Sequence, residues 1–311
     1  MHPTELLFQI VLFPGLLFAA VTGLLLSWVD RKVTARVQMR VGPPLLQPFY
    51  DIAKLMIKET CIPAGAARGL FLAAPLLGLS AVALASSIVW NALLHPDPLQ
   101  AVFVGDIIVV LYLLTMPAAA VVLGAFASRN PLASLGGSRE MKLIVAYELP
   151  FLLAVLVPII KTGDIRLGGI LAEPAATASP SGILALVVAF LCMQAKLTLV
   201  PFDAPEAETE LTGGAYIEYS GPPLAMYKLT RAMMLVTMPA FLVAVFCGGI
   251  AFFNGVLPAL LGVLKPIGLL VLIILVRNTA PRLRIDQAVR FFWGPVSIVA
   301  LLAVFLALTG F

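Results

Sequence analysis

The chain has 311 residues, of which 61% are hydrophobic and only 12% are charged. Soluble domains carry about 25% charged residues, so this composition excludes an ordinary soluble enzyme. The formal charge is only +4, and in a membrane protein such an excess reflects topology more than nucleic-acid binding. Several apolar runs are near 20 residues long, the length that crosses a ~30 Å hydrocarbon layer. We therefore predict an all-α, polytopic transmembrane helical bundle.

The apolar runs predict about eight spans in a single integral membrane domain, residues 1–311. They are expected at 6–29, 69–90, 102–126, 141–160, 181–199, 224–246, 256–276 and 292–308. Pro14 and Gly15 interrupt the first span, which membrane helices tolerate where neighbours satisfy the freed backbone groups. The Gly, Ala, Ser and Pro residues of 161–180 predict an exposed loop.

The distribution of Lys and Arg predicts the orientation. These residues concentrate after the first, third and seventh spans, and basic loops stay in the cytoplasm. We therefore predict cytoplasmic loops at 30–68, 128–141, 200–222 and 277–290, with both termini on the outer side.

Signatures of a catalytic, cofactor or metal site are missing from the sequence. Cys61, Cys192 and Cys247 are far apart and form no CxxC pair, and His2 and His95 have no ligand-spaced neighbour. We expect the cysteines to pack as small apolar residues, and no metal or cofactor to be held by this chain alone.

The most unusual stretch is residues 199–222, named here the acidic segment. Its five carboxylates are Asp203, Glu206, Glu208, Glu210 and Glu218. Asp203 followed by Pro205 and Glu206 predicts a helix start with a capping box; if the stretch is helical, Glu206 and Glu210 share a face. Two interpretations stay open: a solvated loop with ordinary caps, or crowded carboxylates that raise each other's pKa and exchange protons.

Three of the charges in the predicted spans need an explanation, because a charge within the hydrocarbon layer costs several kcal/mol. Asp106 and Lys265 are near or within the third and seventh spans, where they either reach the interface, form a neutralising pair or have a function. Glu148 lies two turns into the fourth span, which favours a proton-handling or water-lined role over static pairing.

The first cytoplasmic loop is basic, and Gly and Pro residues bend it between Arg36 and Pro48. Residues 49–59 then predict an amphipathic helix with Asp51, Lys54 and Lys58 on one side. Such a helix fits the membrane surface or the underside of a peripheral subunit.

Several motifs together resemble one family over nearly the whole chain: the H-type, heel-position membrane subunit of respiratory complex I (NADH-quinone oxidoreductase), shared with energy-converting, membrane-bound nickel–iron hydrogenases. The motifs are Pro201-Phe-Asp-Ala-Pro-Glu-Ala-Glu-Thr-Glu-Leu, Glu218-Tyr-Ser-Gly, Arg40-Val-Gly-Pro-Pro-Leu-Leu-Gln-Pro-Phe-Tyr-Asp-Ile-Ala-Lys-Leu, and Ser138-Arg-Glu followed by Ala146-Tyr-Glu. Quinone-reducing members carry a longer first loop, similar to RxGPNxxGxxGLLQP. The compact loop here resembles the hydrogenase branch, as in formate hydrogenlyase and Ech-type complexes.

The resemblance implies a non-catalytic membrane anchor and ion-coupling subunit in a prokaryotic inner (plasma) membrane. Its implied partners are nickel–iron hydrogenase large and small subunits, an iron–sulfur subunit, antiporter-like membrane subunits and the lipid bilayer, with no nucleic acid. Iron–sulfur clusters and a nickel–iron centre are then expected in the partners. The implied ion path comprises Glu148, Asp203, Glu206, Glu208, Glu210 and Glu218. Residues implied in docking the peripheral arm or balancing charge are Arg36, Arg40, Gln47, Asp51, Lys54 and Arg139.

Two other functions remain as alternatives. One is the quinone-site subunit of a complex I-type enzyme. The other is a self-sufficient secondary transporter, which would more often show an inverted repeat; we find none. The translocated ion, proton or sodium, stays open, as does the electron donor.

Overall fold

A computed structural model describes residues 3–95, 106–250 and 256–310, and over these ranges the chain is helical with no strand. The helices before the acidic segment are α1 (Pro3–Val11), α2 (Leu16–Val37), α3 (Gln47–Ile57), α4 (Arg68–Leu94), α5 (Asp106–Ala127), α6 (Pro131–Thr162), α7 (Leu167–Ala172), the 3-10 turn η2 (Ala176–Ala178) and α8 (Pro180–Lys196). After it come α10 (Pro222–Phe246), α11 (Val256–Thr279), α12 (Ile285–Phe291), a π-helical turn (Phe292–Val296) and α13 (Ser297–Leu308). The prediction of an all-α fold is confirmed.

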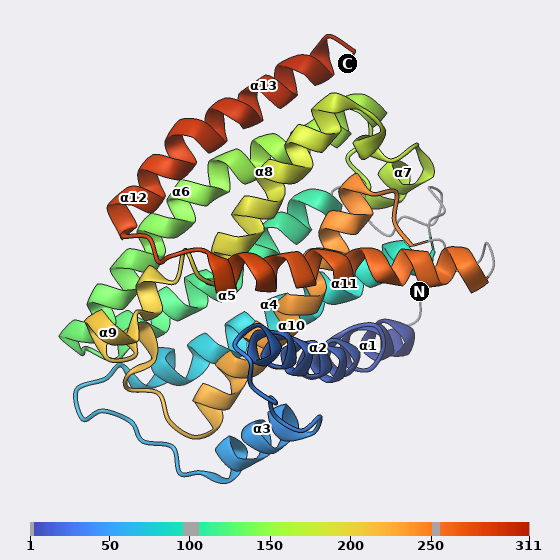
Figure 1. The fold of residues 1–311 in the computed structure, drawn as a ribbon. Coiled ribbons are helices and arrows are strands. Elements are labelled where there is room, and N and C mark those ends of the chain that lie inside the picture. The colour runs from blue at the N-terminus through green and yellow to red at the C-terminus, as the bar shows by residue number, and fades with distance from the viewer. Residues whose placement is uncertain (1–2, 96–105, 251–255, 311) are drawn as a thin grey trace.

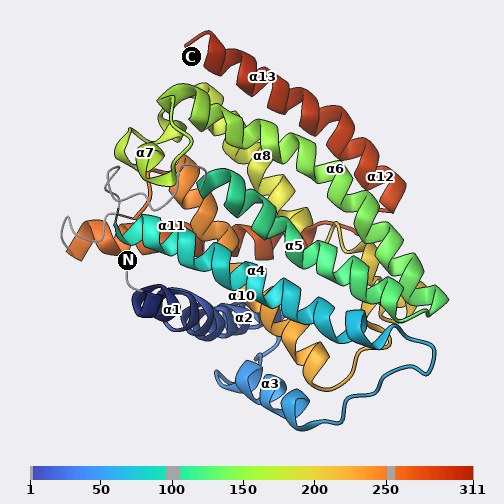
Figure 2. The ribbon, with the colours of Figure 1, turned by 180° about the vertical axis from the view of Figure 1, so that it is seen from behind.

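Seven helical stretches in the described ranges are long and apolar enough to cross a membrane. The 17-residue apolar helix α8 is compatible with an eighth crossing. Both termini lie toward the end of the bundle that carries α7, whereas α3 and the start of α12 lie toward the other end (Figure 1). The view from behind gives the same arrangement (Figure 2).

Helix α10 is the centre of the bundle. Beyond its first turns, which carry Lys228 and Arg231, it has no exposed face: residues 232–246 are almost all apolar and are buried throughout. Phe241 and Phe246 are fully buried and belong to the main core together with Phe151 and Tyr147 of α6. By contrast, α11 and α13 carry many exposed leucines and other large apolar residues, which suits lipid contact.

Helix α6 begins ten residues before the predicted start of the fourth span, so most of the predicted loop 128–141 is helix. Asn130 caps α6, because its side chain accepts a hydrogen bond from Leu132 N at 2.8 Å, and Pro131 occupies the first helical turn. At 1.5 Å per residue, its 32 residues reach about 48 Å, well beyond a ~30 Å hydrocarbon layer. Its early turns can therefore carry the polar residues that the prediction assigned to a loop.

Three other predicted boundaries also differ. The segment 161–180 was expected to be exposed, yet it contains α7, whose first four residues are buried. The first span is interrupted around Pro14 and Gly15, as predicted, but its second helix, α2, runs on to Val37 and does not end at Val29. The predicted loop 277–290 contains most of α12. Residues 102–105 of the predicted third span lie outside the described residues.

Candidate functional site

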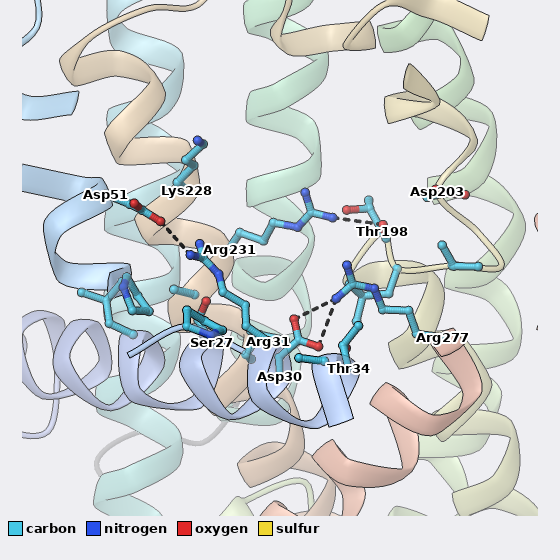
Figure 3. Close-up of a pocket in the computed structure, with 18 of the residues that line it drawn as sticks. Ser27, Asp30, Arg31, Thr34, Asp51, Thr198, Asp203, Lys228, Arg231 and Arg277 are labelled. Carbon is cyan, nitrogen blue, oxygen red and sulfur yellow. Dashed lines mark hydrogen bonds and ion pairs between the residues drawn. The ribbon is translucent and has the colours of Figure 1, made fainter. Parts of the chain in front are cut away.

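A cavity of about 680 Å³, named here the charged cavity, lies at the end of the bundle near α3. Its wall comes from α2, α3, the acidic segment, α10, and α11 with the segment after it (Figure 3). Ten charged residues line it: Asp30, Arg31, Arg40, Asp51, Asp203, Glu206, Lys228, Arg231, Arg277 and Arg282. Six are cations and four are acids, so the wall carries charges of both signs with a small positive excess.

The acidic segment is packed into the bundle, which argues against the solvated-loop interpretation. It folds as short turns, η3 (Ala204–Glu206), α9 (Glu208–Leu211) and η4 (Gly214–Tyr216), and residues 201–205 are buried. Gly136 of α6 makes this packing possible: a Cβ there would lie 2.6 Å from Ala215 N and 3.1 Å from Pro205 O. Gly214 has φ +56°, and a Cβ on it would meet Pro205 O at 2.0 Å.

Glu206 is the central acid of this segment. Its carboxylate lies 2.5 Å from Arg231 of α10 and accepts a hydrogen bond from Thr198 Oγ1 at 3.2 Å. Arg231 also donates to Thr198 O at 3.1 Å. These contacts tie the acidic segment to the central helix at the wall of the charged cavity.

Asp203 does not form the predicted capping box. It precedes η3, but its side chain makes no cap hydrogen bond and instead lies 2.7 Å from Arg282. Its other carboxyl oxygen is buried and receives no hydrogen bond. Burial raises the pKa of Asp203 above its ordinary value, although the Arg282 guanidinium opposes this shift.

The remaining acids point to other partners. Glu210 is half-exposed and lies 2.5 Å from Arg139 of α6, so Glu206 and Glu210 do not act as one helical face. Glu218 accepts a hydrogen bond from Asn130 Nδ2 at 2.5 Å. Glu208 lies on α9, but its side chain is outside the described residues. The structure therefore spreads the predicted acids over several partners.

Glu148 forms a buried ion pair. It lies 3.0 Å from Lys196 Nζ at the end of α8 and accepts a hydrogen bond from Thr115 of α5 at 3.0 Å. The Lys196 side chain is 0% exposed, and its ammonium lies 4.6 Å from the centre of the Phe151 ring. Three helices thus meet at one charged node, and Glu148 is paired in this arrangement.

Asp106 and Lys265 occupy different settings. Asp106 is buried at the first described residue of α5, and one of its carboxyl oxygens has no hydrogen-bond partner among residues 3–95, 106–250 and 256–310. Lys265 donates to Cys247 O at 2.8 Å and Gly249 O at 3.1 Å. It therefore caps the end of α10, where a cation is favourable, and it forms no ion pair with the acids in the described ranges.

The predicted docking residues divide into paired and exposed ones. Asp51 lies 2.7 Å from Arg31 and accepts a hydrogen bond from Gln47 at 3.0 Å. Burial alone would raise the pKa of Asp51, but the hydrogen bonds from Arg31 and Gln47 outweigh it and hold the pKa below its ordinary value. The exposed residues are Arg36, Arg40 and Lys54. Arg139 is engaged by Glu210 and by Ala204 O.

Sequence reasoning missed the partners that complete this site. Asp30 of α2 and Arg277 of α11 form a bidentate pair at 2.8–3.0 Å, visible in Figure 3. The sequence predicted Arg277 and Arg282 only as basic residues of the loop 277–290, and it gave no role to Lys196 and Arg231. The signal available was their position at helix ends next to the acidic segment. Cys61 is exposed, so the expectation of apolar packing is wrong for it.

The fold and these contacts define a polytopic membrane subunit whose ion pairs gather at one end of the bundle. The family model described as NADH dehydrogenase matches residues 9–308. The H-type subunit of NADH-quinone oxidoreductase from Anoxybacillus flavithermus is 34% identical over 89% of this chain and 85% of its own length, and that from Syntrophotalea carbinolica is 35% identical over 92% and 91%. This chain belongs to that family, the H-type membrane subunits of NADH-quinone oxidoreductases.

A solved structure supports the same assignment. A chain of the membrane-bound sulfane sulfur reductase, an archaeal respiratory membrane complex, superposes with a TM-score of 0.85 at 26% identity. The match covers 97% of this chain and 99% of that one. The relatives are thus membrane subunits of respiratory complexes.

Proposed function

We propose that this chain is the membrane anchor and ion-coupling subunit of an energy-converting nickel–iron hydrogenase. It links electron transfer in a peripheral arm to proton or sodium translocation. The observation that carries this proposal is the series of ion pairs that leads from the charged cavity, through Glu206 and Arg231, toward Glu148 and Lys196 in the bundle.

Burying a series of ion pairs costs free energy of desolvation. Replacing a buried ion pair by apolar residues of similar volume is often neutral or stabilising, so stability alone does not account for these charges. Charged residues within membrane bundles mark ion pathways and proton relays by default. The Glu148–Lys196 pair, deep in the bundle, fits a relay.

The compact first loop and the wall of the charged cavity favour the hydrogenase branch. The loop folds back on α2, where Trp28 Nε1 donates to Pro43 O at 3.1 Å. Pockets for organic ligands are lined mainly by apolar and aromatic side chains, whereas ten charged residues line this cavity. A quinone with a long apolar tail is therefore a poorer occupant than water and ions.

One observation favours the quinone-site alternative. A cavity of about 680 Å³ is within the ~300–1,000 Å³ range of ligand pockets. The curated relatives are also named for quinone. The experiment must therefore separate these two functions.

The partners follow from the proposal. The exposed cations Arg36 and Arg40 would receive the peripheral hydrogenase and iron–sulfur subunits, which hold the nickel–iron centre and the clusters. Antiporter-like subunits would contact the lipid-embedded side. Both termini would then lie outside the cytoplasm of a prokaryotic cell, in agreement with their common end of the bundle (Figure 1).

The test uses the purified complex in vesicles. We expect hydrogen formation from a reduced low-potential donor without added quinone, resistance to quinone-site inhibitors, and a nickel–iron large subunit among the co-purifying proteins. Glu206→Gln should lower the ions moved per electron, whereas Glu173→Gln, an exposed acid after α7, should not. Inhibitor-sensitive quinone reduction would establish the alternative, and normal pumping by Glu206→Gln would remove the coupling role.

A further inference from the structure

A second, smaller cavity lies between the two ion pairs described above. Its volume is about 50 Å³, and its wall includes Glu206 and Arg231 on one side and Lys196 on another. A site needs roughly 10–15 Å³ on this measure to hold one water molecule, together with two to four polar partners. This inner cavity meets both conditions, so it can hold water between the Glu206–Arg231 pair and the Lys196–Glu148 pair.

One acid in the wall of the inner cavity has no partner. Glu140 of α6 is 2% exposed, and among the described residues none donates a hydrogen bond to its carboxyl group. It lies nine residues into α6 from Pro131, a rise of about 14 Å along the helix. Sequence reasoning quoted Glu140 only as part of a motif and gave it no role.

The cations in the wall of the inner cavity are already paired with other acids. On α10, Arg231 pairs with Glu206 at 2.5 Å. On α8, Lys196 pairs with Glu148 at 3.0 Å. The other ionisable neighbours in the wall are the hydroxyls of Tyr216 on η4 and Tyr227 on α10, and the latter donates to Ala120 O at 3.0 Å. The wall residues from α5 are Pro117, Ala118 and Val121, which carry no charge.

Within the described part of the chain, this arrangement leaves no free cation for Glu140. An unpaired buried carboxylate costs several kcal/mol, and such groups take up a proton instead. While both ion pairs are closed, Glu140 is therefore a neutral acid. When the Glu206 pair opens, Arg231, whose charge acts on Glu140, becomes available, and Glu140 can release the proton and become its counter-ion.

We infer that Glu140 is the proton-loading residue of this subunit, holding a proton in the hydrated inner cavity and passing it between Glu206 and Glu148. The transfer moves one proton from the Glu140 carboxyl through cavity water to the Glu148 carboxylate, and a second proton, from the Glu206 carboxyl, then reloads Glu140. This inference rests on the proposed function and adds a residue and a translocated ion to it.

The experiment compares Glu140→Gln, Glu140→Asp, Glu206→Gln and Glu173→Gln in the assembled complex in vesicles. A positioned proton-transfer group contributes roughly 10²–10⁴ in rate, so Glu140→Gln should slow coupled proton transfer on the order of 100-fold, with subunit content unchanged. Glu140→Asp should restore part of the rate with a shifted pH profile. Infrared spectra of complex with labelled glutamate should show a protonated carboxyl band that Glu140→Gln removes.

The outcomes separate this inference from the proposed function. Normal proton transfer in Glu140→Gln with loss in Glu206→Gln would overturn the role of Glu140 and leave the coupling role intact. Sodium translocation with no proton uptake would do the same. Normal transfer in both variants would overturn both proposals. If Glu140→Gln does not assemble, absence of the labelled protonated band from the unmodified complex would still refute the inference.

Discussion

Replacing Lys196 by Met tests the charged node in the bundle. Methionine keeps most of the side-chain volume next to Phe151 but removes the ammonium, so Glu148 loses its cation at 3.0 Å. Two unit charges at 3.0 Å attract by about 5.5 kcal/mol at an effective dielectric constant of ~20, before desolvation is subtracted. Breaking one side of a buried pair costs about 3–5 kcal/mol, and because Glu148 is 22% exposed we expect about 3 kcal/mol, at the low end.

The double variant Lys196→Met/Glu148→Gln separates pairing from packing. If the single variant is destabilised because a carboxylate is left unpaired, the second change should recover at least half of the loss. The melting temperature of chains of 150–250 residues shifts by about 2–4 °C per kcal/mol. A loss of ~3 kcal/mol should therefore lower the melting temperature of the single variant by roughly 6–12 °C.

The assay uses the chain's own cysteines. Cys192 is buried on α8, one turn before Lys196, and reacts with a thiol dye only when the bundle opens. Complex in detergent carrying Cys61→Ser and Cys247→Ser, which remove the exposed and the partly exposed thiol, would be heated with a fluorogenic dye, and the dye bound to this chain would be measured after the subunits are separated. Melting of Lys196→Met within about 2 °C of the parent would refute the reasoning. A double variant as unstable as the sum of both single changes would refute it as well.

Three further predictions follow from the contacts. Glu210→Gln should change pumping and melting little, since its half-exposed pair with Arg139 is of a kind worth at most ~1 kcal/mol; a pumping loss equal to that of Glu206→Gln would contradict this. Because the pKa of Asp51 is lowered, its ionised carboxylate stabilises the attachment of α3 at pH values above the unfolded-state pKa. This stabilisation is lost as the pH falls through the folded-state pKa. Relative to the intrinsic amide rate at each pH, hydrogen exchange of α3 should therefore rise only in acid, below about pH 4, and Asp51→Asn should flatten that dependence. Gly136→Ala should displace the acidic segment, because its Cβ meets backbone at 2.6 Å, whereas Gly268→Ala on α11 enters open space; protease sensitivity of residues 199–222 would report the difference.

The sequence predicted the number and order of the spans because an apolar run near 20 residues has few alternatives. It misplaced the start of α6, since polar residues such as Arg139 and Glu140 read as a loop. Both lie on a helix longer than the hydrocarbon layer, and each faces protein: Arg139 faces Glu210, and Glu140 faces the inner cavity. A hydropathy pattern does not reveal which polar residues in a helix have a neighbour.

The ion pairs between residues that are distant in the sequence were the other feature that the sequence could not predict. Asp203 and Arg282 are 79 positions apart, and Asp30 and Arg277 are 247 apart. Local spacing predicted a capping box for Asp203, but a distant arginine competes for the same carboxylate. Only the tertiary fold decides between a backbone amide and a guanidinium.

The ion pairs also explain why a change of charge at one of these residues would alter the contacts of its neighbours. Arg231 holds both Glu206 and the carbonyl of Thr198, two residues beyond Lys196 at the end of α8. Protonating Glu206 would free one of these two contacts, and the guanidinium would then have Glu140 in the same inner cavity as the available acid. Ionisation of Glu140 would in turn place a negative charge in the wall of the inner cavity, which Lys196 also lines, and would weaken the dependence of Lys196 on Glu148. In the proposed relay, a single proton arriving from the charged cavity would be passed along by exchange of partners, because Arg231 lies beside both Glu206 and Thr198 O, and Lys196 lies beside both Glu148 and Thr115 Oγ1.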